Sequence, residues 1–269
     1  MARLRGKRMN LTIYQVDAFT DRLFAGNPAA VCPLADRWPD DRLMLDMARE
    51  NNLSETAFYI RRDDGYHIRW FTPAVEVDLC GHATLAAAHV LFEYEGHSST
   101  GVSFGSRSGP LGVRKEGGWL VMDFPVDVIR KIDTSGEIAS CFDIAPVETY
   151  RGKTDYLLIF RSENDILALK PDLGRIARLD ARGVIVSARG SECDFVSRFF
   201  APRAGVDEDP VTGSAHTTLV PYWRDILGKS EFSAVQLSAR RGFLRCRDRG
   251  ERTEIAGKAV LYMRGEVRL

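Results

Sequence analysis

The chain has 269 residues, which is enough for one large domain or for two domains of roughly 100–150 residues each. Lysine plus arginine and aspartate plus glutamate number 37 each, so no net charge favours nucleic acid or an acidic membrane surface. The hydrophobic content of 45% is that of an ordinary globular protein, and no apolar run approaches the ~18 residues of a membrane-spanning helix.

The first half of the chain predicts strands that surround two helices. Aromatic and β-branched residues predict strands over four segments: 11–19, 29–32, 57–61 and 66–71. We expect a first helix from about residue 38 to Asn51, because Pro39 and two aspartates stand at its start. A second helix is expected from Gly81 to about Glu95. Its side chains are apolar on nearly every side, which is typical of a buried helix, so strands must wrap around it.

The second half repeats this order of elements. Strands are expected over five segments: 184–188, 194–200, 232–237, 242–248 and 259–263. A helix is expected from Gly213 to about Leu227, and residues 122–126 are the expected crossover between the two halves. Acidic residues interrupt the arginine-rich segment 240–252, which favours a solvated hairpin over a nucleic-acid contact.

A long-range duplication explains the repeated order. Arg69-Trp70-Phe71-Thr72-Pro73 returns as Arg198-Phe199-Phe200-Ala201-Pro202, and Gly81-His82-Ala83 returns as Gly213-Ser214-Ala215. Between proline and glycine the second copy is longer. The duplication predicts two similar lobes, with the two glycine turns facing each other across a cleft.

The cysteines and the first residues indicate where the protein works. Five cysteines are scattered along the chain, at positions 32, 80, 141, 193 and 246. No Cys-x-x-Cys pair or Cys/His spacing suggests zinc, so we expect a cytoplasmic protein without a metal site. Residues 1–8 are basic, but no apolar segment or cleavage site follows them, and we interpret them as an extension before the fold.

Each buried helix begins at a glycine turn, which leaves main-chain N–H groups unpaired and a partial positive charge at its first turn. Two such helix starts facing one cleft would bind a carboxylate or an enolate oxygen. The alternative is that Gly81 and Gly213 only allow close packing.

The two glycine turns differ in a way that bears on the chemistry. The residue before the first glycine is Cys80, and the residue before the second is Thr212. A two-base racemase on a duplicated scaffold would need an acid/base residue at both places, and a threonine cannot serve near neutral pH. Cys80 is either a lone reactive thiol at a helix start or, as free cysteines commonly are, a small buried apolar residue.

Glu55 is the better candidate for a base. It stands between a helix end and an apolar strand, where loss of water would raise its pKa toward neutrality. The stretch in register in the second half, residues 181–183, has no carboxylate. The alternative is a structural role for Glu55 in a salt bridge or at the helix end.

Two further polar residues adjoin the glycine turns. His82 follows the first glycine and is placed to donate to a developing oxyanion or to shuttle a proton. Asp209 is placed to hold His82 or Ser214, or to cap the second helix.

Four motifs resemble the phenazine-biosynthesis PhzF-like isomerases, a group within the diaminopimelate-epimerase-like superfamily. The motifs are Gly-Asn-Pro-Ala-Ala-Val at 26–31, Leu-Ser-Glu-Thr-Ala-Phe at 53–58, Asp-Leu-Cys-Gly-His-Ala-Thr at 78–84 and Asp-Pro-Val-Thr-Gly-Ser-Ala-His at 209–216. The similarity runs in order from about Leu11 to the C-terminus. It therefore covers nearly the whole chain.

The resemblance implies an α+β fold of two pseudo-symmetric lobes, each a curved, mostly antiparallel sheet or barrel wrapped around a central helix. The implied first lobe spans residues 9–126 and is completed by a C-terminal strand at 258–269, and the second lobe spans 127–257. It also implies proton transfer without a cofactor on a small carboxylic acid, and a homodimer.

The resemblance also assigns roles to residues of this chain. The implied catalytic residues are Glu55, His82 and Asp209, and the implied substrate-binding residues are Asn27, Gly81, Gly213 and Ser214. The related racemases use two cysteines. Because Cys80 is paired with Thr212 here, the sequence does not favour two-thiol racemisation.

Three functions remain open from the sequence. The first is an isomerase in which Glu55 moves a proton α or vinylogous to a substrate carboxylate. The second is an epimerase or dehydratase that uses the single thiol of Cys80. The third is a binding protein for small acids that has lost its chemistry.

Overall fold

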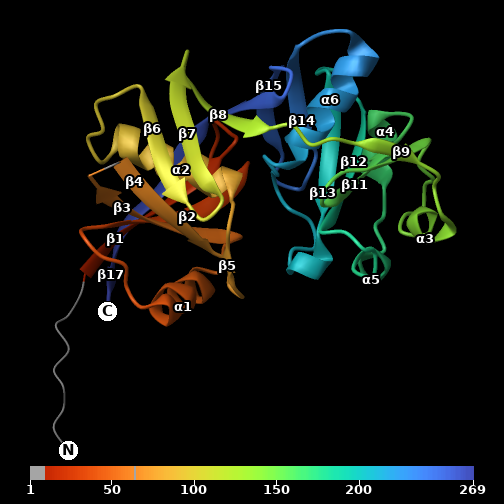
Figure 1. Cartoon of the computed structure of the whole chain (residues 1–269). Coiled ribbons are helices and arrows are strands. Elements are labelled where there is room, and N and C mark those ends of the chain that lie inside the picture. Colours follow the sequence, from red (N-terminus) through yellow and green to blue (C-terminus); the bar gives the residue numbers. More distant parts are fainter. Residues whose placement is uncertain (1–9, 64) are drawn as a thin grey trace, which may run out of the picture.

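The structure is a computed structural model that describes residues 10–63 and 65–269. Two lobes of mixed strands and helices stand side by side, joined by strands that pass between them (Figure 1). The extension expected at residues 1–8 lies outside the described residues.

Strands wrapped around one long helix form the first lobe. Its elements are β1 (Asn10–Ala18), β2 (Asn27–Leu34), α1 (Asp41–Asn51), β3 (Glu55–Arg62), β4 (Gly65–Phe71), β5 (Glu76–Val77), α2 (Gly81–Glu93), β6 (Gly101–Ser106), β7 (Gly109–Glu116) and β8 (Trp119–Pro125). The two helices and the strands expected from the sequence in this half are present.

The second lobe has the same plan with additional short helices. Its elements are β9 (Arg130–Ile132), α3 (Gly136–Ala139), β10 (Glu148–Arg151), β11 (Asp155–Ile159), α4 (Glu163–Ala168), α5 (Leu173–Ile176), β12 (Gly183–Arg189), β13 (Phe195–Phe200), the 3₁₀ turn Pro202–Ala204, α6 (Ala215–Leu227), β14 (Glu231–Gln236), β15 (Gly242–Asp248) and β16 (Arg252–Gly257). A last strand, β17 (Ala259–Arg268), follows.

The strand pairings of the two lobes correspond one by one. In the first lobe β2 is parallel to β3, β3 antiparallel to β4, β4 parallel to β6, and β6 to β8 antiparallel in turn. In the second lobe the five pairings from β11 through β12, β13, β14 and β15 to β16 repeat these directions. The duplication seen in the sequence is therefore a duplication of topology.

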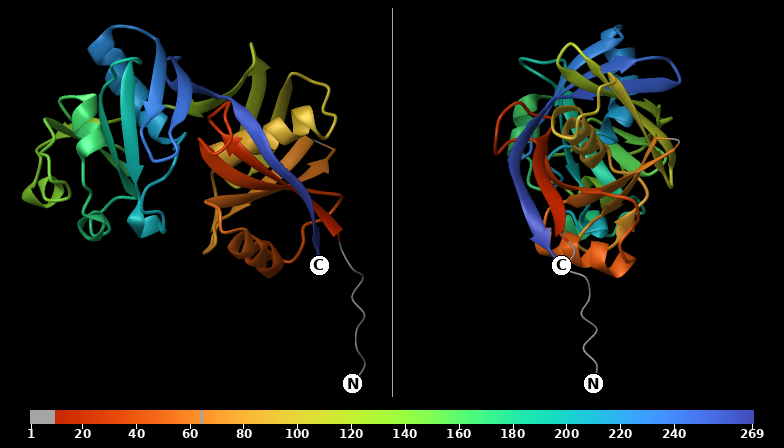
Figure 2. Two further views of the ribbon diagram at one scale, coloured as in Figure 1. Left: turned by 180° about the vertical axis from the view of Figure 1, so that it is seen from behind. Right: turned by 90° about the vertical axis from the view of Figure 1, so that its left-hand side faces the viewer.

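The lobes exchange their outer strands. After β8 the chain enters the second lobe as β9, which pairs with β10, and after β16 it returns as β17, which pairs with β1 along its whole length. Figure 2 shows β17 running beside β1. β8 and β16 also pair with each other, so a continuous ladder of main-chain hydrogen bonds crosses the seam.

The crossover expected at residues 122–126 coincides with the end of the strand β8, after which the chain passes to β9 of the second lobe. The strand β16 was not expected, because charged residues alternate with its short apolar positions. The hairpin expected at 240–252 exists as β15 and β16, and it is part of the sheet.

Each lobe is filled by its central helix. In α2 nearly every side chain is buried, including Ala86, Ala87 and Ala88, whose small size lets the strands approach the helix closely. The strands in contact with α2 include β1, β2, β3, β8 and β17. In α6 the buried side chains include Leu219, Val220 and Trp223. The prediction of two buried helices is confirmed.

The start of α6 differs from the sequence prediction. The helix begins at Ala215 rather than Gly213, because the preceding residues form a tighter turn in which Ala215 N–H donates to the Thr212 carbonyl. His216 Nδ1 lies 3.0 Å from the same carbonyl oxygen and holds it in place. Among the described residues, no helix is both long enough and apolar enough to cross a membrane.

The contact between β16 and the first lobe gives a test of the fold. A Cβ on Gly257 would lie 2.3 Å from Phe19 Cδ1 and 3.0 Å from Leu85 Cδ1 of α2. We predict that Gly257→Ala lowers the free energy of unfolding by about 1–3 kcal/mol through overpacking. Denaturant unfolding measures this change.

Gly112→Ala is the matched control, because a Cβ at this strand position meets no atom within 4 Å. Equal stability of the two variants would contradict the packing described for the seam.

Candidate active site

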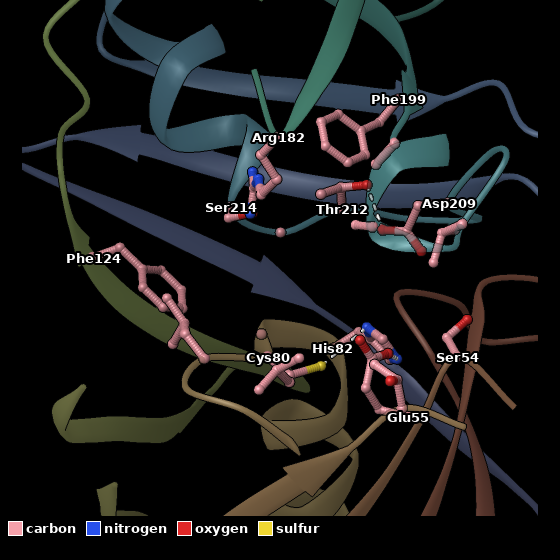
Figure 3. Close-up of a pocket in the computed structure, with 18 residues that line it drawn as sticks. Ser54, Glu55, Cys80, His82, Phe124, Arg182, Phe199, Asp209, Thr212 and Ser214 are labelled. Atoms are coloured by element: carbon pink, nitrogen blue, oxygen red, sulfur yellow. Dashed lines mark hydrogen bonds and ion pairs between the residues drawn. The ribbon is translucent and has the colours of Figure 1, made fainter. Parts of the chain in front are cut away.

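A cavity of about 260 Å³ opens between the lobes. Its lining comes from both, and it includes residues from each of the motifs around the two glycine turns: Ser54, Glu55, Thr72, Val77, Leu79, Cys80, Gly81, His82, Phe124, Arg182, Phe199, Ala201, Ala204, Val206, Asp209, Thr212, Gly213 and Ser214. Figure 3 shows Glu55, Cys80 and His82 on one side, facing Arg182, Thr212 and Ser214 on the other.

Glu55 is the first residue of β3 and is largely buried. Helix α1 ends at Asn52 in the left-handed conformation, and this turn delivers the chain into β3 with the Glu55 side chain directed into the cavity. Its side chain is 16% exposed, and Oε2 lies 3.2 Å from His82 Nε2. Both atoms are buried, and neither has a hydrogen-bond partner.

Burial raises the pKa of the Glu55 carboxyl to about 8, and the negative charge of Asp209 adds to this effect. A contact with the Cys80 thiol acts in the opposite direction and is the smaller cause. The carboxyl therefore exchanges its proton near neutral pH, which is the property that general base catalysis requires.

His82 is the second residue of α2, and burial lowers its pKa to about 3. The ring is therefore neutral at physiological pH. Its Nδ1 lies 3.2 Å from Asn27 Nδ2 and 3.5 Å from Cys80 Sγ.

Asn27, expected from the sequence to bind substrate, is fully buried outside the lining of the cavity, where it connects the two lobes. Its Nδ2 donates to Asp209 Oδ1 at 2.8 Å and to the Val211 carbonyl at 2.9 Å. Gly26, at φ +65°, comes so close to the Ala18 carbonyl that a Cβ there would lie 2.1 Å from the oxygen, so the turn that places Asn27 requires glycine. Arg240 of the second lobe donates to the Gly26 carbonyl at 2.9 Å.

Asp209 is not arranged as any of the three sequence-based expectations had it. It does not cap α6, which has no side-chain cap, and it makes no hydrogen bond to His82 or Ser214. Its carboxylate accepts hydrogen bonds from Asn27 Nδ2 and, at 2.5 Å, from Thr212 Oγ1. The link from Asp209 to His82 runs through Asn27, which occupies the space between them. Burial raises the pKa of the Asp209 carboxyl to about 6.

Gln236, which the sequence analysis did not identify, holds the loop that carries Asp209 and Thr212. The fully buried Gln236 donates to the Asp209 carbonyl at 2.7 Å and accepts from Thr212 N–H at 2.9 Å. Two hydrogen bonds from one side chain thus fix the backbone just before Gly213.

The starts of the two helices face each other. No side chain caps the first turn of α2 or of α6. A Cβ on Gly81 would lie 3.9 Å from Gly213 Cα, so the two turns nearly touch. Two helix starts beside one cavity place partial positive charge there, which favours an anion. In α6 the first N–H groups, at Ala215, His216 and Thr217, already donate to the carbonyls of Thr212, Gly213 and Ser214.

Cys80 is buried at the start of α2. Burial raises the pKa of its thiol well above the ordinary value, and the charge of Glu55 adds to this effect. A thiol in this setting is held protonated, which favours the apolar interpretation of Cys80 over the reactive one.

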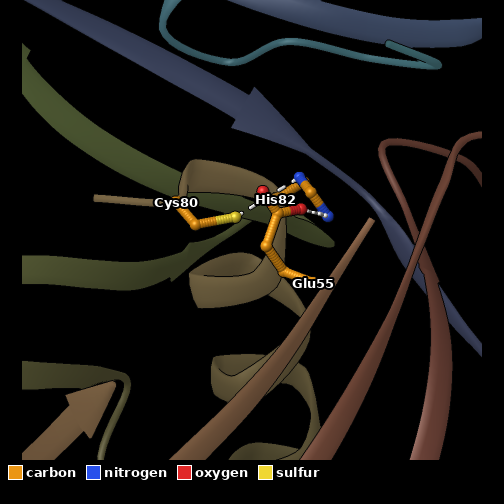
Figure 4. A group of neighbouring side chains, drawn as sticks. All are labelled: Glu55, Cys80 and His82. Atoms are coloured by element: carbon orange, nitrogen blue, oxygen red, sulfur yellow. Dashed lines mark hydrogen bonds and ion pairs between the residues drawn. The ribbon is translucent and has the colours of Figure 1, made fainter. Parts of the chain in front are cut away.

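Glu55, Cys80 and His82 form a cluster of possible metal donors, each with one donor atom within 4.8 Å of the others (Figure 4). However, the carboxylate approaches His82 Nε2 and the sulfur approaches Nδ1. One ion can bind only one of the ring nitrogens, so the present arrangement is not a preformed metal centre.

Arg182 is a functional candidate that the sequence analysis missed. Thr56 pairs with Phe71 and Val184 pairs with Phe200, and Phe71 and Phe200 are equivalent in the duplication. By this register Gly183 replaces Glu55 in the second lobe, and Arg182 replaces Ser54. The register of the repeated strands is thus the signal that could have identified Arg182.

The Arg182 guanidinium is fixed by three contacts. It pairs with both oxygens of the buried Asp155, lies over the Phe199 ring at 5.3 Å, and donates to Ser214 Oγ at 3.2 Å. Among the described residues that line the cavity, it is the only cationic side chain.

Comparison with known proteins gives consistent results. Residues 16–265 match the family described as phenazine biosynthesis-like protein. An uncharacterised isomerase of Pseudomonas aeruginosa is 54% identical over 261 residues, which cover 97% of this chain and 100% of that protein. A crystal structure of a PhzF-family phenazine biosynthesis protein from Enterococcus faecalis has a TM-score of 0.94 at 43% identity, covering 97% of this chain and 100% of that one.

A more distant structure supports the fold alone. A hydroxyproline epimerase from Agrobacterium vitis has a TM-score of 0.62 at 9% identity, covering 97% of this chain and 93% of that one. The predicted α+β fold of the diaminopimelate-epimerase-like type is confirmed.

The buried Glu55 carboxyl predicts a stability change that needs no substrate. Its folded pKa of about 8 exceeds its ordinary value of 4.5, so the stability it contributes is complete below about pH 4.5 and is lost as the pH rises through 8. Glutamine has no proton to lose. We predict that the free energy of unfolding of Glu55→Gln, relative to that of the original protein, increases by on the order of a few kcal/mol between pH 5 and pH 9.

Denaturant unfolding of both proteins at the two pH values measures this difference. A stability difference that does not change with pH would contradict the buried, protonated state of Glu55.

Proposed function

Because the chain belongs to the phenazine biosynthesis-like (PhzC–PhzF) family and is an isomerase, we propose that it moves a proton within a small carboxylic acid, with Glu55 as the base and without a cofactor. The observation that carries the proposal is the placement of Glu55. A carboxyl whose pKa is about 8 stands beside two uncapped helix starts in one cavity.

The substrate carboxylate binds at the two helix starts. In this proposal the main-chain N–H groups near Gly81 and Gly213 donate to the anion and the Ser214 hydroxyl adjoins them, since all three residues line the cavity. Binding there places the carbon next to the carboxylate, or its vinylogous position, within reach of Glu55.

The reaction then needs one base. The Glu55 carboxylate removes a proton from the activated carbon, and the electron pair of the C–H bond moves into the carboxylate to give a dienolate. The helix starts and His82 stabilise the added negative charge, each such donor contributing about 10²–10³ in rate. Glu55 returns the proton to another carbon on the same face, and the electrons reform the carboxylate with a shifted double bond.

The asymmetry of the cleft supports a shift rather than a racemisation. A racemase needs a second base on the opposite face of the substrate, but the second lobe has Gly183 in the place of Glu55 and Thr212 in the place of Cys80. Asp209, with a pKa of about 6, is available to bind a substrate amine or to orient His82 through Asn27.

A single-thiol epimerase or dehydratase is the second candidate, because Cys80 lines the same cavity. Its protonated thiol weakens this candidate. A protein that binds small acids without chemistry is the third.

Hydrogen–deuterium exchange in two variants separates these three candidates. We expect Glu55→Gln to lower the rate of hydrogen–deuterium exchange at substrate carbons by about 10²- to 10⁴-fold, which is the typical contribution of a general base. The measurement is NMR in deuterated water with a panel of small unsaturated and cyclic amino and carboxylic acids.

Cys80→Ser is the matched variant and is expected to retain exchange. Retained exchange in Glu55→Gln together with its loss in Cys80→Ser would show that the thiol is the base. Binding of acids by calorimetry without exchange in the original protein would favour the binding protein.

A second prediction concerns the helix starts. A Cβ on Gly81 would meet Gly213 Cα and Phe124 Cζ at 3.9 Å, which is ordinary van der Waals contact, so Gly81→Ala should fold normally. The added methyl group would occupy the space of the bound anion. We expect exchange to fall by about 10²-fold or more while the melting temperature stays close to that of the original protein.

Gly112→Ala, in the exposed part of β7, is the control for a glycine-to-alanine change that touches nothing. Unchanged exchange in Gly81→Ala would show that the helix starts do not bind the reacting carboxylate.

A further inference from the structure

A second cavity, shallow and widely open to solvent, adjoins the catalytic one on the second lobe. It has a volume of about 400 Å³ and is lined by Arg151, Thr154, Asp180, Ala181, Arg182, Arg203 and Ala204. Arg182 and Ala204 also line the catalytic cavity, so the two spaces share a wall. The longer segment of the second repeat, between Pro202 and Gly213, contributes Arg203 and Ala204 to this wall.

The charge of this second cavity is positive. Three of its seven lining residues are arginines, and Asp180 is the one acidic residue among them. Asp155, which is not part of the lining, already pairs with Arg182 and neutralises one of the three charges. The remaining side chains leave a net excess of positive charge beside the catalytic cavity.

The three guanidinium groups are held in place but keep donors free. Arg151 lies over the Tyr156 ring at 4.6 Å, and its buried Nη1 has no hydrogen-bond partner. Arg203 donates through Nη1 to the Leu179 carbonyl at 3.3 Å. Arg182 uses Nε and Nη2 on Asp155 and Ser214.

A buried guanidinium nitrogen without a partner costs free energy in the absence of a ligand. Planar guanidinium groups bind the oxygens of carboxylates and phosphates with paired hydrogen bonds. The charges and planar donors of Arg151 and Arg203 therefore indicate an anion, and the buried Nη1 of Arg151 would reach it after a rotation of the side chain.

We propose that Arg151, Arg182 and Arg203 form a subsite for a second anionic group of the substrate, a carboxylate or a phosphate. This inference rests on the proposed function, because the first carboxylate occupies the helix starts at Gly81 and Gly213. Arg182 stands between the two positions, since it lines both cavities and contacts Ser214. The substrate class is thus a small acid with two negatively charged groups.

The experiment compares matched pairs of probes by calorimetry. L-glutamate and L-glutamine test a second carboxylate, O-phospho-L-serine and L-serine test a phosphate, and inorganic phosphate tests the anion alone. We expect the original protein to bind at least one acidic probe about 10-fold or more tightly than its neutral partner, the contribution of a charge-assisted hydrogen bond.

The variant that tests the subsite is Arg151→Gln/Arg203→Gln, which leaves the Arg182–Asp155 pair intact. We expect it to lose the preference for the acidic probe while its affinity for the neutral partner stays the same. Arg151→Lys/Arg203→Lys keeps both charges and shows whether a loss follows charge rather than folding. Arg189→Gln is the matched control, because Arg189 is exposed at the opposite end of β12.

The proposal is overturned if no acidic probe, phosphate included, binds the original protein more tightly than it binds the double glutamine variant. This outcome differs from a failure of the proposed function. That failure would appear as a lack of hydrogen–deuterium exchange at substrate carbons, which is measured without these probes.

Discussion

The close approach of Gly81 and Gly213 is the constraint on which the cleft depends. The starts of the two central helices meet almost in contact, and a Cβ added to either glycine would lie within ordinary van der Waals distance of its neighbours. Their uncapped first turns supply the positive potential for an anion. Helix ends of this kind would lower the pKa of a neighbouring carboxyl, yet burial dominates at Glu55 and raises it to about 8.

The fold was largely predictable from the sequence, because the evidence for it is local or repeated. Apolar residues on all sides of α2 and α6 predicted buried helices, and the second copy of the Arg-x-Phe motif predicted the second lobe. The seam was not predictable, because β8 and β16 come from distant parts of the chain and their pairing depends on the assembled lobes. The short helices α3, α4 and α5 carry too few residues for a periodic pattern.

The site was predictable only in part. Motif resemblance and chemical type identified Glu55, His82 and the glycine turns, and these residues lie in one cavity. Asn27 lies between Asp209 and His82, whereas one expectation from the sequence had Asp209 hold His82 directly. This arrangement exists only once the lobes are assembled. Arg182 and Gln236 have no motif of their own. Strand register was needed to place Arg182, and the tertiary fold was needed to place Gln236.

The most direct test of this account is the titration of Glu55 itself. Carboxyl-labelled glutamate followed by carbon-13 NMR, with Glu55→Gln to assign the resonance, reports the pKa of this single group in the folded protein. The account predicts that Glu55 titrates near pH 8, several units above its ordinary value of 4.5. A Glu55 carboxyl that ionises near its ordinary value of 4.5 would contradict the account, since no buried base would then exist in the cleft.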